Sequence, residues 1–349
     1  MNIALVGDGF VHADIMEAVF RELFPNDTYV KLEVDWPSRP FQRNDEVVEY
    51  VGDPSELSSV VKQADVLVVS VAPVTRAMIE SSPNLKIIGC TRGGPVNVNI
   101  AAAHDHNIPV VFAPGRNAAA TAEYTIGMLL AGLRNIGHGH AALSQGRWVH
   151  EFYLYENVGF ELDGKVAGVI GFGNVGQRVA YVLKSLGCTV LCYDPWVPPS
   201  AIAAAGVSPV ERLEELLPQV DLLTLHARQT AENYHMISEE QLARMKPSAF
   251  LVNTSRGGLL DYDALFRSLS AGRLRGAALD VFEEEPPPLD HPLLRLPNVT
   301  VTPHIAGATR ETAARGTQLV AEAVRELLNG GRPNNCKFPD GWSAKGKVG

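Results

Sequence analysis

The sequence predicts an α/β protein with two doubly wound parallel-sheet domains. Its 349 residues exceed what one domain of common size requires. Short runs rich in Val, Ile and Leu alternate with helical patterns, which is typical of βαβ units. The runs form two series separated by one long helical stretch, so each series is expected to build its own sheet.

The first series lies in the N-terminal third and predicts a small doubly wound domain. Its runs have the length of buried parallel strands. They are NIALVGD from residue 2, YVKLEVD from 29, ADVLVVSVA from 64, LKIIGCTR from 85 and IPVVFAP from 108. Gly7 and Gly9 follow the first run, but a third glycine and an acidic strand end at the expected distance are missing. This turn is therefore interpreted as an ordinary strand-to-helix connection.

The helical stretch between the two series covers residues 117–143. Apolar residues stand on nearly all of its sides, which predicts a well-buried helix. It is expected to be an interdomain helix, a dimer arm, or both.

The second series predicts a dinucleotide-type domain, whose usual plan has six strands. Its runs are KVAGVIGFG from 165, TVLCYD from 189, VDLLTLHA from 220, AFLVNTSRG from 249, GAALDVF from 276 and VTVTPH from 299. Ser238 and Gln241 form a capping-box pattern at a helix start. Asp261 and Gly272 bracket a further helix as N-cap and C′ residues.

The last predicted helix runs from Thr309 to Leu328 and is amphipathic, with Gly330 and Gly331 after its end. The polar segment that follows, RPNNCKFPDGWSAKGKVG, is expected to be loosely ordered.

The composition excludes several classes of function. The formal charge is −9 and the pI about 5.6, which argues against binding to nucleic acid or an anionic membrane. No run is apolar and long enough to span a bilayer, and the N-terminus reads as a strand rather than a signal peptide. The four cysteines show no zinc-like spacing, so no metal site is predicted and a reducing cytoplasm is expected.

A glycine-rich turn predicts the cofactor site. Gly171, Gly173 and Gly176 stand as G-x-G-x-x-G between a strand run and a helical pattern. Gly171 permits a tight turn, Gly173 lets backbone approach a pyrophosphate, and Gly176 lets helix and strand pack closely. Asp194 ends the next strand, where a carboxylate binds ribose hydroxyls and repels a 2′-phosphate. The cofactor is therefore predicted to be NAD rather than NADP.

Four further segments carry a resemblance to a known family. They are ELDGKVAGVIGFGNVG, LVNTSRGGLLD, ALDVFEEEP and TPHIAGAT, in this order. From about residue 65 to 333 the chain resembles the D-isomer-specific 2-hydroxyacid dehydrogenases, and among them the phosphoglycerate dehydrogenase-like branch. The resemblance implies hydride transfer between nicotinamide and a small 2-hydroxyacid or 2-oxoacid.

Three side chains suit that chemistry. Arg256 stands at a predicted strand end, where its guanidinium can hold a substrate carboxylate. Histidine as a residue type titrates near neutral pH, so His304 suits the acid/base role. Glu285 is selected among three consecutive glutamates because the family places its catalytic glutamate before a proline. Glu283 and Glu284 are expected to be solvated.

The resemblance also implies binding residues. For the cofactor it adds, beside the three glycines and Asp194, Asn174, Val175, His226, Ala227, Thr254, Ser255, Asp280, Ala306 and Gly307. For the substrate carboxylate it implies the backbone of Gly93 and Gly94, with Arg92 as a further anion contact beside Arg256.

Three departures from the family pattern leave the substrate open. The chain reads LHARQT where LHxPxT is usual, Asn174 stands where arginine is common, and the substrate loop ends VNVN without the usual aspartate. The side chain of the oxoacid and the direction of the reaction in the cell are not predicted.

The family's topology implies a discontinuous substrate domain. Residues 1–117 and 309–349 would form a flavodoxin-like substrate domain, into which a Rossmann NAD domain of residues 118–308 is inserted. The reaction would take place in the cleft, and a homodimer is expected.

Three alternatives share this fold. Formate dehydrogenases resemble the chain but carry glutamine at the position of Glu285. Phosphite oxidation uses a similar Arg, Glu and His trio. An NAD-sensing protein like the C-terminal-binding corepressors keeps the trio but works through a peptide-binding cleft, and a turnover assay separates it from an enzyme.

Overall fold

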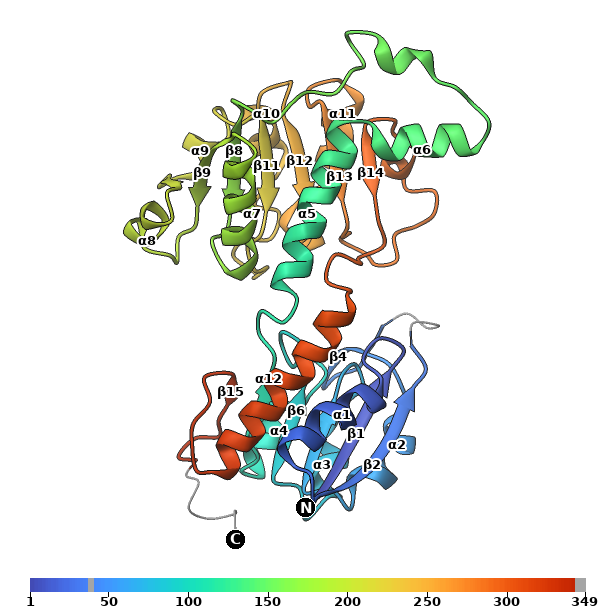
Figure 1. Ribbon diagram of the computed structural model, residues 1–349, viewed down its shortest axis with the longest axis vertical. Helices are drawn as coiled ribbons and strands as arrows, with labels where there is room; N and C mark the ends of the chain where they lie inside the picture. The colour runs from blue at the N-terminus through green and yellow to red at the C-terminus, as the bar shows by residue number, and fades with distance from the viewer. Residues whose placement is uncertain (37–40, 343–349) are drawn as a thin grey trace. The chain divides into compact units, whose positions relative to one another are not determined.

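The computed structural model describes residues 1–36 and 41–342, and the chain divides into two compact units (Figure 1). The first unit comprises Met1–Asn117 with Ala308–Gly349, and the second comprises Ala118–Gly307. Each unit has its own parallel sheet with helices on both faces. The prediction of an α/β fold with two doubly wound sheets is confirmed.

The sheet of the first unit has the order β15-β7-β6-β5-β1-β2. Its strands are β1 Asn2–Asp8, β2 Thr28–Val34, β5 Val66–Val69, β6 Ile87–Cys90, β7 Val110–Phe112 and β15 Cys336–Lys337. All neighbours pair in parallel except β15, which is antiparallel to β7. Without β15 this is the strand order of flavodoxin-like folds. In these folds the second strand lies on one side of the first, and the later strands are added on the other side.

Alternate residues of the first unit's strands supply its two cores. On β1, Ile3 and Leu5 face the helices α1 (Ala13–Leu23) and α12 (Arg310–Leu328). Ala4 and Val6 face the other way, toward α2 (Pro54–Val61), α3 (Arg76–Glu80) and α4 (Ile100–Asp105). A small hairpin of β3 (Gln42–Arg43) and β4 (Val48–Tyr50) completes the described elements of this unit.

The sheet of the second unit has the order β10-β9-β8-β11-β12-β13-β14, and all its strands are parallel. The strands are β8 Val166–Ile170, β9 Thr189–Tyr193, β10 Ser208–Pro209, β11 Leu222–Leu225, β12 Phe250–Asn253, β13 Gly276–Leu279 and β14 Val299–Val301. This is the dinucleotide-binding order 3-2-1-4-5-6 with one more strand at its end. The short β10 was not predicted from the sequence.

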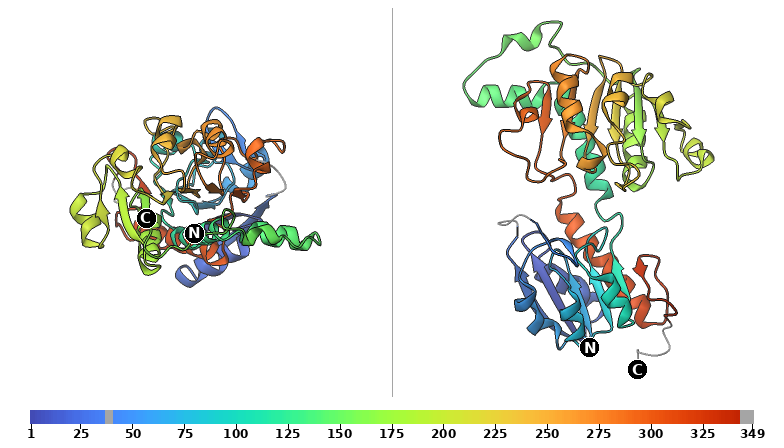
Figure 2. Two further views of the ribbon diagram at one scale, coloured as in Figure 1. Left: turned by 90° about the horizontal axis from the view of Figure 1, so that it is seen from above. Right: turned by 180° about the vertical axis from the view of Figure 1, so that it is seen from behind.

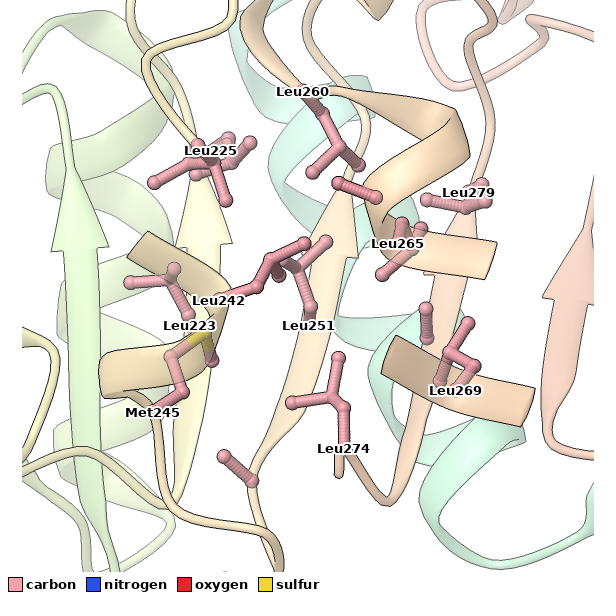
Figure 3. Close-up of a cluster of buried hydrophobic side chains, with 14 of the residues drawn as sticks. Leu223, Leu225, Leu242, Met245, Leu251, Leu260, Leu265, Leu269, Leu274 and Leu279 are labelled. Atoms are coloured by element: carbon pink, nitrogen blue, oxygen red, sulfur yellow. The ribbon is translucent and has the colours of Figure 1, made fainter. Parts of the chain in front are cut away.

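Helices cover both faces of this second sheet. One face packs on α5 (Ala118–Leu133), α7 (Asn174–Ser185) and α8 (Pro199–Ala204). The other packs on α9 (Leu213–Leu216), α10 (Glu239–Arg244) and α11 (Tyr262–Ser270). Figure 3 shows this second face, where leucines of β11, β12 and β13 meet leucines of α10 and α11. Three short 3-10 helices are η1 (His150–Tyr153), η2 (Gly257–Leu259) and η3 (Pro292–Arg295).

The predicted helix caps are present. Ser238 and Gln241 form a capping box at the start of α10, and Asp261 accepts a hydrogen bond from the backbone of Ala264 at the start of α11. Thr309 caps α12, which has the bounds that the amphipathic pattern predicts. None of the helices in residues 1–36 and 41–342 is long and apolar enough to cross a membrane.

The single buried helix predicted for residues 117–143 is wrong in two respects. The helix breaks after α5, because Asn135 adopts a left-handed backbone with φ 56°, and α6 (Ile136–Ser144) follows. Of α6 only Ala142 is buried. Figures 1 and 2 show α6 and η1 extending away from the sheet of their own unit, so the apolar side chains there have no core to face.

The prediction of a loosely ordered tail is also wrong for the described part of it. β15 pairs with the edge strand β7, and the side chain of Asn335 donates to the backbone oxygen of Phe112 at 2.7 Å. The rings of Phe338 and Trp342 pack with centroids 4.8 Å apart. Residues 343–349 lie outside the described residues.

Candidate active site

The register of the second unit's sheet brings the sequence motifs to one edge. Ile170 is opposite Tyr193 on one side and Leu225 on the other. Leu225, Asn253, Leu279 and Val301 continue this line across the sheet. The residues that directly follow these strand ends are Gly171, Asp194, His226, Thr254, Asp280 and Thr302. Residues predicted from five separate motifs therefore share one carboxyl edge, where α/β sheets bind ligands.

The glycine-rich turn follows β8 and has different surroundings at each glycine. Gly171 has φ 93°, and a Cβ there would lie 2.7 Å from the backbone nitrogen of Ala227. A Cβ on Gly176 would lie 1.9 Å from the oxygen of Gly171. At Gly173, the N-cap of α7, nothing lies within 4 Å of an added Cβ. Two glycines are thus required by packing, while Gly173 faces open space at a helix N-terminus, where backbone N–H groups attract an anion.

Asp194 is held by the backbone around it. Its Oδ2 accepts a hydrogen bond from Phe172 N at 2.7 Å, and its Oδ1 accepts from Trp196 N at 2.8 Å. The carboxylate therefore joins the glycine-rich turn to the end of the next strand, a structural role that the sequence does not indicate. Oδ1 also accepts from Val197 N at 3.2 Å. Oδ2 can still accept a second hydrogen bond and is the oxygen able to receive a ribose hydroxyl.

His226 carries an unpaired nitrogen at this edge. Its Nε2 lies 2.8 Å from Thr224 Oγ1, whereas its Nδ1 is shielded from solvent and has no partner among the described residues. Burial lowers the pKa of His226 to about 3, so the ring is neutral at physiological pH. An unpaired buried polar atom is costly, and a bound ligand would remove that cost.

Asp280 organises the segment that follows β14. Its Oδ1 accepts from Thr302 Oγ1 at 2.6 Å and from Ile305 N at 3.0 Å, while its Oδ2 accepts from Ala306 N at 2.8 Å. Its own backbone oxygen accepts from His304 N at 2.7 Å. Asp280 therefore shapes the loop that presents His304, whether or not it also contacts a cofactor.

Thr254 and Ser255 lie after β12 with their hydroxyls already engaged. Thr254 Oγ1 lies 2.6 Å from Thr125 Oγ1 on α5, and Ser255 Oγ donates to Asn253 Oδ1 at 3.0 Å. The side-chain amide of Asn253 in turn donates to the backbone oxygen of Arg256 at 2.9 Å. These bonds fix the backbone that leads into Arg256.

The three predicted catalytic residues come together at the same edge. His304 Nδ1 lies 2.6 Å from Glu285 Oε2, and Phe282 N donates to Glu285 Oε1 at 2.9 Å. His304 has φ 54°, a left-handed backbone that a non-glycine residue adopts only where its surroundings hold it. No hydrogen bond of His304 Nε2 occurs within the described residues, so this nitrogen is free to meet a substrate.

The charge of Glu285 follows from its neighbours. Burial raises the pKa of the Glu285 carboxyl, but the hydrogen bond and charge of His304, the Phe282 N–H and the charge of Arg256 outweigh burial. The net effect lowers the pKa of Glu285 below its ordinary value, so the group is a carboxylate at neutral pH.

Arg256 stands between β12 and η2 and is exposed. Its Nη1 donates to the backbone oxygen of Ser255 at 2.7 Å, and its guanidinium forms no ion pair among the described residues. A carboxylate from outside the chain can therefore bind it bidentately.

The predicted substrate residues of the first unit follow β6. Arg92 Nη1 donates to the backbone oxygen of Glu49 at 2.7 Å, Nη2 pairs with the Glu49 carboxylate, and the guanidinium lies over the Phe41 ring. Nothing lies within 4 Å of an added Cβ at Gly94, and at Gly93 only the oxygen of Ala113 does, at 3.9 Å. The two glycines are open to a ligand, while Arg92 already has a counter-ion.

One cluster beside the trio is missed by the sequence reasoning. Glu283, expected to be solvated, is exposed but accepts a hydrogen bond from Tyr234 Oη and lies 3.1 Å from His235 Nε2. Only its place two residues before Glu285 hints at such a role, because Tyr234 and His235 come from a distant loop. Glu284 has neither a hydrogen bond nor an ion pair within the described chain, in line with its predicted solvation.

The comparison with protein families now decides the family. Residues 126–306 match the family described as D-isomer specific 2-hydroxyacid dehydrogenase, NAD binding domain. This match covers more than half of the chain and lies within the second unit. The chain belongs to the D-isomer-specific 2-hydroxyacid dehydrogenase family. The recognition made from the four sequence motifs is confirmed.

Individual relatives agree with this assignment. A D-3-phosphoglycerate dehydrogenase of Methanocaldococcus jannaschii is 43% identical over 79% of the chain, and a glyoxylate reductase of Korarchaeum cryptofilum is 37% identical over 79% of the chain. The chain covers 83% of the second relative but only about half of the first and of a similar Archaeoglobus fulgidus enzyme. A NAD-dependent formate dehydrogenase of Staphylococcus aureus, solved with NAD, is 29% identical, with a TM-score of 0.74 and coverage of 98% of this chain and 99% of that one.

NAD is the cofactor of this domain family, and the second unit has features that fit it. Gly173 leaves space at the α7 N-terminus for a pyrophosphate, and His226 Nδ1 offers a buried polar atom that still lacks a partner. Asp194 provides a carboxylate at the adjacent strand end. The predicted cofactor is confirmed at the level of the family.

Proposed function

We propose that this protein is an NAD-dependent D-2-hydroxyacid dehydrogenase, or 2-oxoacid reductase. The observation that carries the proposal is the 2.6 Å contact between His304 Nδ1 and Glu285 Oε2, with Arg256 close enough to influence the same carboxylate. The trio lies at the carboxyl edge that also carries the glycine-rich turn. When bound, NAD(H) supplies or accepts the hydride.

Each residue of the trio has one task in this proposal. Arg256 binds the substrate carboxylate and polarises the neighbouring oxygen. His304 uses Nε2 to give a proton to that oxygen during reduction or to take it during oxidation. Glu285 accepts a hydrogen bond from Nδ1–H of His304, which fixes the ring's orientation and stabilises its protonated form.

We further propose the cofactor contacts predicted from the sequence. The turn residues Gly171 to Gly176 would bind the pyrophosphate through backbone N–H groups, and Asp194 would bind the adenosine ribose. The nicotinamide would lie among the residues that follow β11, β12, β13 and β14. These residues are His226, Ala227, Thr254, Ser255, Asp280, Ala306 and Gly307.

For the substrate we propose small 2-oxoacids or 2-hydroxyacids. Gly93 and Gly94 would offer backbone N–H groups from the substrate domain, which we assign to residues 1–117 with 309–349. Because Arg92 is paired with Glu49, it would bind a second substrate anion only by exchanging that partner. A substrate with a strongly charged side chain is therefore a weaker match for this site than one with a neutral side chain.

We propose a homodimer that forms through the segment of α6 and η1. Six large apolar residues of this segment are between 47% and 93% exposed: Ile136, Leu143, Trp148, Tyr153, Leu154 and Tyr155. Exposed apolar surface of this extent marks an association site. The double variant Trp148→Arg, Tyr155→Arg should change a dimer into a monomer in light scattering, while an unchanged mass would reject this segment as the interface.

A cytoplasmic location stays a prediction. The four cysteines are free thiols in the structure, and a reducing compartment would keep them so.

The test of the proposed function is NADH oxidation with a panel of 2-oxoacids. The panel contains glyoxylate, hydroxypyruvate, pyruvate, 2-oxoglutarate and phosphohydroxypyruvate, with formate and phosphite assayed in the oxidative direction. Turnover with a 2-oxoacid supports the proposal. Turnover only with formate or phosphite, or tight NADH binding without any turnover, would reject it.

A further inference from the structure

A second cluster of polar side chains lies beside the catalytic trio. The loop of residues 226–238 brings Tyr234 and His235 together, with ring centroids 4.0 Å apart and an interplanar angle of 18°. Both side chains meet the carboxylate of Glu283, which accepts from Tyr234 Oη and lies 3.1 Å from His235 Nε2. Glu283 stands two residues before Glu285, on the same short segment.

The loop that carries this pair has a fixed shape of its own. Asn233 accepts from Thr230 N at 2.7 Å and donates to the backbone oxygen of Arg228 at 2.7 Å. His235 has φ 52°, a conformation that persists in a non-glycine residue only where neighbours hold it. The loop therefore holds Tyr234 and His235 in place to donate hydrogen bonds to Glu283.

The same loop is tied to the segment of Arg256. His235 N donates to the oxygen of Gly258 at 2.7 Å, and Ile237 N donates to the oxygen of Leu259 at 3.0 Å. A Cβ on Gly257 would lie 2.4 Å from Glu283 N, so the backbones of the two catalytic segments are in direct contact there. Three segments meet at this point, and two of them carry Arg256 and Glu285.

We propose that Glu283 is a positioning residue for the reaction. Through Tyr234 and His235 it ties the Glu285 segment to the Arg256 segment, which sets the distance between the carboxylate clamp and the acid/base pair. The inference rests on the proposed function, because it assumes that the trio performs the chemistry.

The charges around the cluster are consistent with a stable tie. The hydrogen bond to Glu283, followed by burial and the charges of Glu283 and Asp261, raises the pKa of Tyr234. The phenol therefore keeps its proton at neutral pH and continues to donate to Glu283. A glutamine at position 283 would still offer an oxygen to both donors, whereas alanine would offer none.

Three consecutive glutamates make a matched experiment possible. Glu283→Ala should lower kcat about tenfold, because small displacements of catalytic groups have large effects on rate. It should leave the Kd for NADH unchanged. Glu284→Ala, one residue away and exposed, should match wild type, and Glu283→Gln should restore most of the rate.

A second readout separates positioning from folding. If Glu283 holds the Glu285 segment, its loss should loosen the contact between Glu285 and His304 and so weaken the support for protonated His304. In the direction of 2-oxoacid reduction, where His304 donates the proton, the basic limb of the kcat–pH profile should then move to lower pH. Arg256 also acts on the pKa of Glu285, and Asp280 lies against the backbone of His304; both are the same in every variant. A lower Tm with unchanged kcat and pH profile would show a structural role only and overturn the proposal.

The outcomes also separate this inference from the proposed function. An active wild type in which Glu283→Ala equals Glu284→Ala would reject the positioning role alone, and so would Glu283→Gln with the full defect of alanine. A wild type without turnover of any 2-oxoacid would reject both.

Discussion

In each unit the central strand, β1 or β8, is followed by a glycine-containing turn and a helix, yet the two turns are filled differently. In the first unit Asp8 Oδ1 accepts from Phe10 N at 2.7 Å, and Glu33 Oε1 accepts from Ala13 N, the first residue of α1, also at 2.7 Å. In the second unit no side chain caps α7, and the space at Gly173 is open.

A helix N-terminus stays available for a ligand only where the chain itself does not cap it. The first N–H groups of a helix have no partner within the helix and favour an anion. In the first unit the chain supplies that anion itself through Glu33, which sits opposite Gly7 in the register of β1 and β2. In the second unit the corresponding strand end supplies Asp194, but its carboxylate binds Phe172 N before the helix begins. The α7 N-terminus is thereby left uncapped, and we propose that the pyrophosphate binds there.

Substitution of His304 tests whether the carboxyl edge of the second unit's sheet performs the reaction. His304→Asn should lower kcat about 1000-fold, because it removes the proton donor and acceptor. NADH binding, measured by fluorescence titration, should stay as in wild type. Glu33→Gln at the first unit's turn should leave kcat unchanged. Substantial turnover by His304→Asn would reject His304 as the acid/base.

A pair of glycine substitutions separates a role in NADH binding at Gly173 from a role in packing at Gly7. Gly173→Val fills open space, so it should leave Tm unchanged and weaken NADH binding about a hundredfold, or ~2.8 kcal/mol. Gly7→Ala places a Cβ 2.3 Å from Ala13 N, and this overpacking should cost ~1–3 kcal/mol of stability. Calorimetry and NADH titration measure both effects. A Gly173→Val protein that unfolds would show that the backbone at Gly173 is needed for packing. The proposed role of this space in NADH binding would then be rejected.

A smaller effect is expected at the strand end. Asp194→Asn keeps one acceptor oxygen for the backbone but removes the charge that repels a 2′-phosphate. The ratio of kcat/KM for NADH over NADPH should fall about tenfold, or ~1.4 kcal/mol. Wild type with equal rates for the two cofactors would contradict the assigned role of Asp194.

The sequence predicted those parts that depend on local pattern. Strand runs, the glycine-rich turn and the caps at Ser238 and Asp261 are encoded by neighbouring residues, so the fold class and the family could be recognised from them. Arg256 could be proposed because it follows a predicted strand, whereas Glu285 was selected by the family's pattern. The two segments follow neighbouring strands, because the register places Asn253 and Leu279 side by side.

The features that the sequence did not predict depend on distant contacts. Glu283 looks solvated until the loop around Tyr234 folds against it, and Glu33 looks like a surface residue of β2 until α1 places Ala13 N beside it. The break at Asn135 needs a left-handed backbone, which asparagine can adopt but does not require. The neighbouring residues give no signal for it.

Glu33 in the first unit and Glu285 in the second should affect the pH dependence of stability in opposite directions. Burial raises the pKa of Glu33 more than the Ala13 N–H lowers it, whereas the pKa of Glu285 is lowered overall. For Glu33 the folded state holds the proton more tightly. Wild type should therefore lose stability relative to Glu33→Gln as pH rises from the ordinary glutamate value, about 4.3, through the raised pKa of Glu33.

Glu285 should show the opposite sign in the same measurement. Its contribution is present above the ordinary pKa and is lost as pH falls through the lowered one, so wild type should lose stability relative to Glu285→Gln on acidification. Urea unfolding of the two variants and wild type between about pH 3 and 7 measures both slopes. A Glu33 slope of the same sign as that expected for Glu285 would mean that the Ala13 N–H outweighs burial and lowers the pKa of Glu33. The first turn would then favour the charged carboxylate of Glu33, whereas a raised pKa means that burial opposes its charge.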